Sequence, residues 1–261
     1  MIKIKPAAAV VMASNFVNRI LLSTMLDTIN HECSPRKTSL VRHRVRHRIF
    51  HRAGDRDCSP AAVIRIDPSA DQLAFAKRAG VSMAEFHVGD AQDLPFSNNS
   101  FDIVVMALVI HFVPSPGKAL SEMSRVLRPG GWAAAYVWDY TKSGSPTAPL
   151  SAAMKVIGLQ SPGPPSPNAT SLPALEELWR TSGFVQIGTR TINIPVEFTD
   201  FEEFWNSTTM PVGPVGKAIA QLSPNDRDRL RGILQERMPL TANGRVIYEA
   251  RANAIKGRKT P

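Results

Sequence analysis

The sequence predicts a three-layer α/β sandwich, in which a mostly parallel β-sheet lies between layers of helices and the last strand runs antiparallel. Strand-like apolar runs alternate with helix-like segments from residue 61 onward, and this alternation is typical of α/β folds. The run from Phe101 to Ile110 is almost continuously apolar, as in a strand buried on both faces. A helical pattern over residues 115–128 connects it to a further β run, Trp132–Trp138, which predicts a right-handed βαβ unit.

The crossover helix of this unit has clear start and stop signals. Ser115 can cap the helix and Pro116 fits its first turn. Apolar residues recur at helical spacing up to Leu127, and Arg128 is expected in the last turn. The Pro-Gly-Gly sequence at 129–131 is expected to stop the helix.

The other elements are predicted by the same periodicities and by their flanking Gly, Pro, Ser and Asp residues. Expected helices cover 10–29, 69–79, 150–159, 172–182 and 222–238, with another beginning at Asp200. Expected strands cover 61–66, 86–88, 184–198 and 246–255, the last one antiparallel to 184–198.

Polar residues follow several of the predicted strands directly. Asp67 ends one strand, Gly89–Ala91 follows the next, and Leu108–Phe112 and Asp139–Tyr140 follow two others. Ligands of open α/β sheets bind at the carboxyl ends of the strands. These four positions are therefore the candidate site.

Three motifs follow one another in this part of the chain: GDAQDLPF, then FDIVVMALVIHF, then a helix closed by RVLRPGG. They resemble the motifs of class I S-adenosylmethionine (SAM) dependent methyltransferases, specifically the small-molecule type 11 group. Upstream AAVIRIDPSADQLAFAKRAG, and downstream FEEFW and GRVIYEARANAIKGR, are also similar to this group. The resemblance covers roughly residues 61–256. It implies a Rossmann-like sheet and a cytoplasmic enzyme that transfers a methyl group from SAM to a small organic acceptor.

The resemblance also implies a set of cofactor-binding residues. Asp67 would accept from both ribose hydroxyls of SAM, because two adjacent hydroxyls can donate to the two oxygens of one carboxylate. Asp90 would accept from the adenine amino group, and the Ala91 N–H would donate to a ring nitrogen. Pro68 and Leu108 complete the set. Two structural roles compete with these: Asp67-Pro68 also fits a helix N-terminus, and Gly-Asp also fits a plain turn.

The catalytic group is left open by the sequence. Methyl transfer from a sulfonium is an in-line displacement that mainly requires alignment of the acceptor and exclusion of water. His111 is the candidate base for an acceptor hydroxyl or amine, and Asp139 and Tyr140 are expected beside it. The competing expectation is that His111 packs against the cofactor or a lid.

The segment from residue 141 to 170 is rich in Pro, Ser and Gly. In this group such insertions cover the acceptor pocket, so we expect acceptor specificity to lie here. Trp205, Met210 and Pro211 are further candidates for that pocket, although aromatic residues at helical spacing more often belong to a core.

The first sixty residues form a divergent, Arg/His-rich segment, and residues 61–261 form the methyltransferase-like domain. Eight of the basic residues behind the net charge of +9 lie between residues 31 and 60. The simplest expectation is a solvated, poorly ordered segment. A nucleic-acid-binding arm is the second alternative function of the protein. It predicts salt-sensitive nucleic-acid binding that is lost when residues 36–56 are deleted. The repeated His43, His47 and His51 lie among arginines, which disfavours a metal site.

The remaining composition fits a cytoplasmic enzyme. At 261 residues and 43% apolar, the chain can bury a large core. It contains no apolar run of the roughly 18–20 residues that a membrane span needs. The two cysteines, Cys33 and Cys58, match neither a zinc motif nor a disulfide framework. Asn15 and Arg19 interrupt the apolar N-terminal run, which disfavours a secretory leader.

One expected motif is missing. A class I methyltransferase opens its sheet with a strand ending in an acid, followed by a glycine-rich turn that lets the backbone approach the cofactor. Met25–Thr28 is a possible stub of that strand, with Asp27 as its acid, but no glycine precedes Gly54. A degenerate relative with impaired or no SAM binding is therefore the first alternative function. We hypothesise that residues 29–58 come from a shifted reading frame.

This hypothesis is tested on the gene. If the frame is shifted, translating codons 25–60 in one of the two other frames should produce a Gly-x-Gly-x-Gly turn after Leu26-Asp27. Two alternative frames without such a turn would show that the segment is genuine.

Overall fold

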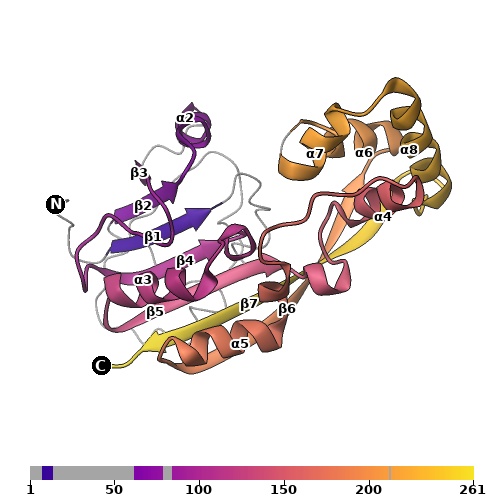
Figure 1. The fold of residues 1–261 in the computed structure, drawn as a ribbon. Coiled ribbons are helices and arrows are strands. Elements are labelled where there is room, and N and C mark those ends of the chain that lie inside the picture. The colour runs from indigo at the N-terminus through magenta and orange to yellow at the C-terminus, as the bar shows by residue number, and fades with distance from the viewer. Residues whose placement is uncertain (1–7, 14–61, 79–83, 212) are drawn as a thin grey trace.

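The computed structural model describes residues 8–13, 62–78, 84–211 and 213–261. The described chain forms one seven-stranded sheet in the order β3-β2-β1-β4-β5-β7-β6 (Figure 1). The strands are β1 Ala8–Ala13, β2 Ala62–Asp67, β3 Ala84–Val88, β4 Phe101–Ala107, β5 Leu127–Trp138, β6 Phe184–Phe198 and β7 Val246–Lys259. β7 pairs antiparallel with both β5 and β6, and the first five strands in the chain pair in parallel. The predicted fold class is confirmed.

Helices connect most of the strands. They are α2 Ala70–Arg78, η1 Ile110–Phe112, α3 Pro116–Val126, η2 Tyr140–Lys142, α4 Ala148–Val156, η3 Pro167–Thr170, α5 Leu172–Thr181, α6 Phe201–Thr208, α7 Gly213–Ala220 and α8 Pro224–Arg237. The predicted caps of α6 and α8 are present, since Asp200 accepts from the Glu203 N–H and Ser223 from the Asp226 N–H. α7 was not predicted.

The N-terminal prediction is wrong where the structure tests it. The helix expected over 10–29 is replaced at its start by β1, which lies between β2 and β4 in the middle of the sheet. The apolar sequence AAVVMA fits a strand paired on both sides. The proposed stub at Met25–Thr28, the reading-frame segment 29–58 and the Arg/His-rich residues lie outside the described residues.

The ends of the central βαβ unit also differ from the prediction. β4 stops at Ala107 rather than Ile110. α3 ends at Val126, and Leu127 already pairs with Phe101 in the next strand. The Pro-Gly-Gly sequence therefore does not stop the helix. It forms an irregularity in β5, where the pairing jumps from Leu127 to Trp132, and a Cβ on Gly131 would lie 2.9 Å from the Asp102 carbonyl.

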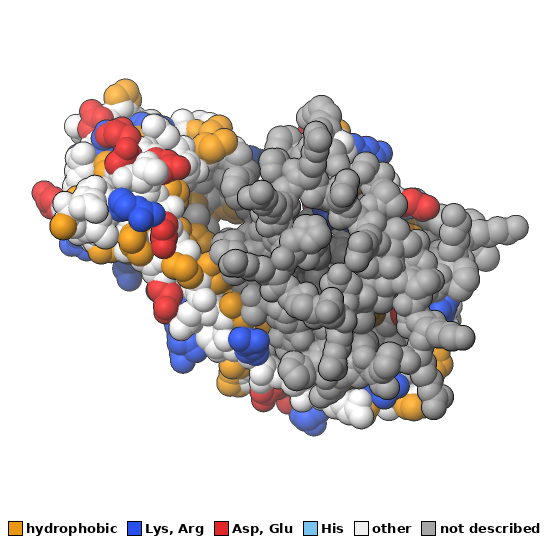
Figure 2. All heavy atoms as spheres, turned by 180° about the vertical axis from the view of Figure 1, so that it is seen from behind, with side chains coloured by type: hydrophobic (Ala, Val, Ile, Leu, Met, Phe, Trp, Pro, Cys, Tyr) orange, Lys and Arg blue, Asp and Glu red, His pale blue; other side chains and the backbone are white. Residues whose placement is uncertain are grey.

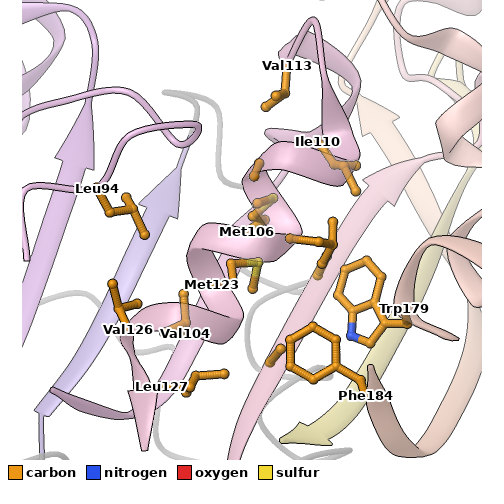
Figure 3. Close-up of a cluster of buried hydrophobic side chains, with 14 of the residues drawn as sticks. Leu94, Val104, Met106, Ile110, Val113, Met123, Val126, Leu127, Trp179 and Phe184 are labelled. Carbon is orange, nitrogen blue, oxygen red and sulfur yellow. The ribbon is translucent and has the colours of Figure 1, made fainter. Parts of the chain in front are cut away.

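The main core lies between the sheet and helices α3 and α5 (Figure 3). Met123 and Val126 of α3 and Trp179 of α5 are fully buried in this core. The same cluster includes β4 residues such as Val104 and Met106. A second cluster, including Val105, Ala134 and Ile192, covers the other face of the sheet. These two apolar faces hold the strands so that their carboxyl ends form one edge.

The outer ends of β6 and β7 carry a separate helical unit made of α4, α6, α7 and α8 (Figure 1). Its core includes Leu150, Phe204, Leu230 and Leu234. Trp205 belongs to this core, is 3% exposed and lies under the guanidinium of Arg227 at 5.3 Å. Core packing is thus the role of Trp205, whereas Met210 and Pro211 are exposed.

From behind, Lys, Arg, Asp and Glu side chains are interspersed over the helical unit (Figure 2). A mixed surface of this kind differs from the single-sign patch that nucleic acid selects. Among the helices of the described ranges, none has the length and apolar character that crossing a membrane requires.

The loop between β3 and β4 is held against α3 by one arginine. Arg125 donates from Nη1 to the Phe96 carbonyl at 2.7 Å and from Nη2 to the Leu94 carbonyl at 2.8 Å. The same guanidinium donates to Glu122 at 2.6 and 2.7 Å, and Glu122 accepts from the Leu94 N–H at 2.7 Å. The hydrogen bond from Arg125 is the main cause of the lowered pKa of Glu122. This clamp of Glu122 and Arg125 sets the path of residues 89–98 over α3.

β4 ends at a residue with an unusual backbone. Leu108 has a φ of 58°, in the left-handed region that costs a residue with a Cβ roughly 1–2 kcal/mol. Its N–H donates to the Tyr136 carbonyl at 2.9 Å, and its side chain is 2% exposed. These contacts hold the strained turn that leads from β4 into η1.

The clamp predicts that Arg125→Lys lowers the free energy of unfolding by about 2 kcal/mol, because one ammonium cannot replace bonds to two carbonyls and a carboxylate. Urea unfolding measures this change. Arg180→Lys is the matched control, since Arg180 and Glu177 have the same spacing on α5 but are both more than half exposed. The control should leave the unfolding midpoint unchanged; equal losses in the two variants would contradict the clamp.

The backbone of Leu108 predicts a reversed order of stability at this position. Leu108→Gly should be more stable than Leu108→Ala by about 1 kcal/mol, because both lose the side chain but only glycine adopts positive φ freely. Val105 is a buried position of β4 and is the control. There, Val105→Ala should be more stable than Val105→Gly. Urea unfolding of all four variants checks this, and the same order at both positions would argue against strain at Leu108.

Candidate functional site

The candidate site begins where β2 and β3 end side by side. Asp67 pairs with Val88 at the last step of the ladder, and the Gly89 N–H donates to the Asp67 carbonyl at 3.2 Å. The arrowheads of β1, β2 and β4 point the same way in Figure 1, as parallel pairing requires. Asp67 and the turn at 89–91 therefore occupy neighbouring strand ends at one edge of the sheet.

Asp67 forms a local turn with part of its carboxylate. Oδ1 accepts from the Ser69 N–H at 2.8 Å. Burial raises the pKa of Asp67, and the Ser69 hydrogen bond opposes this shift. The alternative role as helix cap is wrong: α2 begins at Ala70, and the Leu73 N–H bonds the Ser69 carbonyl. Pro68 is exposed beside Asp67.

The turn after β3 is stabilised by its own acid. Asp90 Oδ1 accepts from the Gln92 N–H at 2.8 Å, and the Gln92 amide lies 3.2 Å from Oδ2. Gln92 Oε1 also accepts from the Ser115 N–H at 3.0 Å, which connects the turn to the start of α3. The turn role expected as the alternative for Asp90 is thus present. Ala91 is half-buried against the main core, and its N–H has no acceptor among the described residues.

A second group of polar residues lies at the ends of β4 and β5. His111 of η1 is 1% exposed, and its ring centre lies 5.0 Å from that of Tyr140 and 4.0 Å from that of Phe112. Its Nδ1 is buried without a hydrogen-bond partner. Burial lowers the pKa of His111 to about 4, and burial also raises the pKa of Tyr140. The structure therefore places His111 and Tyr140 together, as expected.

Asp139 and the segment 141–170 are held to the sheet next to this pair. Asp139 is 2% exposed, accepts from the Thr141 hydroxyl at 2.6 Å and lies 3.5 Å from Arg251 Nε. Thr170 of η3 accepts from the Tyr140 N–H at 3.1 Å, and its carbonyl accepts from Asn253 Nδ2 at 2.8 Å. Asp139 therefore has a structural partner on each side and is not available as a free base.

Arg65 is an unusual residue for a strand interior, and the structure gives it an aromatic environment. Its guanidinium carbon lies 6.0 Å from the Phe86 ring centre. Burial lowers the pKa of Arg65, and the neighbouring Tyr136 opposes that shift. Arg65 Nε and the Tyr136 hydroxyl are both buried without hydrogen-bond partners in the described chain. We assign no role to this pair.

Sequence reasoning missed the residues that support the site. Gln92, Glu122 and Arg125 hold the turn at 89–92 and the loop after it, although none binds at the edge itself. The only signal in the sequence is the i,i+3 spacing of Glu122 and Arg125 in SEMSRVL, which also occurs in surface ion pairs. In the described ranges no group of three or more His, Cys, Asp or Glu side chains could hold a metal ion.

Comparison with known sequences relates part of the chain to methyltransferases. Residues 48–135, about a third of the chain, match the family model described as methyltransferase domain. A fatty-acid O-methyltransferase of Mycolicibacterium smegmatis is 40% identical over 78 residues, which are 30% of this chain and 28% of that protein. A demethylmenaquinone methyltransferase of Clavibacter sepedonicus is 43% identical over 75 residues, 28% of this chain and 31% of that protein. The chain thus spans under a third of the length of these relatives.

Comparison with solved structures concerns the whole fold. The YcgJ protein of Bacillus subtilis aligns with a TM-score of 0.54 and 16% identity, over 98% of this chain and 92% of that one. A candidate methyltransferase from Bacillus halodurans C-125 aligns with a TM-score of 0.52 and 15% identity, over 99% and 95%. Together with the strand order and the family match, these likenesses confirm the resemblance: the chain has the fold of the class I SAM-dependent methyltransferases, and its residues 48–135 match a methyltransferase domain.

Proposed function

We propose that this protein binds SAM at the ends of β2 and β3 and transfers its methyl group to a small organic acceptor. The observation that carries the proposal is the position of Asp67 beside the turn at 89–91, on neighbouring strand ends of a sheet with the methyltransferase strand order. The names of the two relatives describe enzymes that methylate a fatty acid and a demethylmenaquinone, which favours a small-molecule acceptor.

The residues at this edge suit the adenosine half of SAM. Asp67 accepts from the Ser69 N–H through Oδ1, and its carboxylate has further lone pairs, so a ribose hydroxyl can donate to it. The Ala91 N–H lacks an acceptor in the described chain, so a ring nitrogen of adenine can accept from it. Asp90 already accepts from Gln92, yet an exposed carboxylate has further lone pairs for an amino group. Leu108 and Pro68 would supply apolar contact around these polar groups.

The mechanism then depends on alignment. SAM supplies a methyl group that is activated by its sulfonium. The tips of β2 and β4 lie two strand spacings apart, about 10 Å, so a cofactor held at Asp67 can extend toward η1. The segment 141–170, held by Thr170 and Asp139, lies next to that end and can exclude water from the acceptor. We place acceptor specificity there.

A degenerate methyltransferase that binds SAM weakly or not at all is the second candidate function. Between the end of β1 at Ala13 and the start of β2 at Ala62 the sequence contains a single glycine, Gly54. A side chain in the turn after β1 would occupy space that the methionine portion needs. We therefore expect weaker SAM binding than in relatives with a glycine-rich turn.

We expect Asp67→Ala to weaken SAM binding by about 1.5–3 kcal/mol, because a hydrogen bond to a charged carboxylate is lost. Isothermal titration of SAM and of S-adenosylhomocysteine measures the change, and Asp67→Asn should lose a similar amount. Asp71→Ala is the matched control, since Asp71 is an exposed acid in the first turn of α2.

The same titration separates the two candidate functions. Binding by the wild-type protein that falls in both Asp67 variants and not in the control supports the enzyme. Affinity unchanged by Asp67→Ala would remove Asp67 from the site, and a wild-type protein that binds neither ligand would favour the degenerate relative.

A further inference from the structure

We propose that His111 accepts a proton from the acceptor during methyl transfer, and that the acceptor therefore reacts through an alcohol or phenol hydroxyl rather than a carboxylate or an amine. This inference rests on the proposed function and specifies its substrate class. A carboxylate carries no proton at neutral pH and needs no base, whereas a hydroxyl group must lose its proton. An alkylammonium group is too weak an acid to pass its proton to a weakly basic imidazole.

The first support is an unsatisfied buried atom. Native proteins leave few buried polar side-chain atoms without a partner, and each one calls for an explanation. In the described chain there are six, and two of them, His111 Nδ1 and Arg251 Nε, lie near the carboxyl ends of β4 and β5. Arg251 Nε faces Asp139 at 3.5 Å. His111 Nδ1 is buried without any hydrogen-bond partner in the described chain, so an acceptor that reaches it would supply the missing partner.

The second support is the position of the imidazole. The strained turn at Leu108 ends β4 and directs the chain into η1, so that His111 lies at the edge where substrates of such sheets bind. Its ring is placed between Phe112 and Tyr140. Phe112 is 38% exposed, so one of the two rings next to His111 reaches the protein surface.

The third support is the contact between the backbone of His111 and the segment 141–170. Ser166, just before η3, donates from its N–H to the His111 carbonyl at 3.0 Å and from Oγ to the Val113 carbonyl at 2.9 Å. η3 belongs to the segment that we expect to determine acceptor specificity. Two hydrogen bonds of one serine thus hold part of that segment against the backbone of η1 at His111, so an acceptor bound by this segment would lie close to the histidine.

The chemistry is balanced by one proton transfer. A lone pair of the acceptor oxygen forms the bond to the methyl carbon, and the carbon–sulfur bond breaks with its electron pair going to sulfur. The acceptor O–H bond breaks as its proton passes to His111, which later returns it to water. An alkylated oxygen that still carries its proton is a far stronger acid than imidazolium, so even a weakly basic imidazole can accept the proton as the new bond forms.

The groups around His111 keep it neutral before the reaction. Burial lowers its pKa to about 4. The facing titratable group is Tyr140, whose pKa is raised by burial, and η3 contributes no titratable side chain. Asp139 is near in sequence to Tyr140, but its carboxylate is paired with Thr141 and Arg251. No anion of the described residues is placed to stabilise a permanent imidazolium.

The experiment uses the full chain, methyl-labelled SAM and four probe acceptors: octanol, 4-butylphenol, octylamine and octanoate. We expect methylation of octanol or 4-butylphenol, and none of octylamine or octanoate. On the methylated probe His111→Asn and His111→Phe should lower kcat by about 100-fold or more, the scale of general-base catalysis, with SAM affinity unchanged by isothermal titration. His87→Asn, at a partly exposed histidine of β3, is the control and should retain wild-type kcat. Using two substitutions guards against a variant that fails to fold.

The pH dependence gives a further readout. An imidazole with a pKa near 4 is neutral throughout the range from pH 5.5 to 8, so the wild-type rate should show no transition near 6.5. Because the unfolded chain takes up a proton on this histidine below about 6.5 and the folded chain does not, wild-type stability should also fall between pH 6.5 and 4 more than that of His111→Asn.

Several results would overturn the inference. They are methylation of octanoate or octylamine alone, methylation of neither hydroxyl probe, a kcat within threefold of wild type in both His111 variants, or a loss of SAM affinity in those variants that explains the lost rate. Wild-type protein that binds no SAM would overturn the proposed function itself, and this inference with it. Normal SAM binding with unaffected His111 variants overturns the inference alone.

Discussion

The geometry of the candidate site depends on the clamp of Glu122 and Arg125. A parallel sheet brings strand ends to one edge, but the loop that follows β3 must still be directed over α3 so that the turn at 89–92 stays beside Asp67. Arg125 does this by bonding the carbonyls of Leu94 and Phe96, while Glu122 takes the Leu94 N–H. A planar guanidinium suits this task because it can donate to several acceptors at fixed angles.

The sheet edge formed by the carboxyl ends of the strands also carries two features that normally destabilise a folded protein. Leu108 has a left-handed backbone, and His111 has a buried nitrogen without a partner. Both are held by a core that includes Met106, Ile110 and Val113, which are almost completely buried. Unfavourable local geometry of this kind persists where surrounding packing determines it, and such positions cluster at functional sites. The strained residue and the unpaired nitrogen are three residues apart in the chain.

Fold and cofactor site make separate demands on the N-terminal part of the sequence. A strand in the middle of the sheet needs only a short apolar run that can pair on both sides, and β1 supplies this with AAVVMA. A turn for the methionine portion of SAM needs glycine, and the sequence directly after Ala13 contains none. The seven-stranded sheet is therefore present in the described chain, even though the glycine-rich turn expected from the resemblance does not follow β1 in the sequence.

The sequence by itself determined the fold class, β6, α3, α5, α6, α8 and the strand ends that hold Asp67, Gly89 and Asp139, because these depend on local periodicity and on capping and turn residues. It placed β1 wrongly, ended β4 and α3 late and missed α7, since pairing and packing decide those limits. Only the tertiary structure decided which side chains fix the loops at the carboxyl ends of the strands. Arg125 bonds Leu94 across 31 positions of the chain, and the backbone carbonyl of His111 accepts from Ser166, 55 residues later. Contacts between distant segments leave no periodic trace in the sequence, because each partner alone looks like an ordinary surface or core residue.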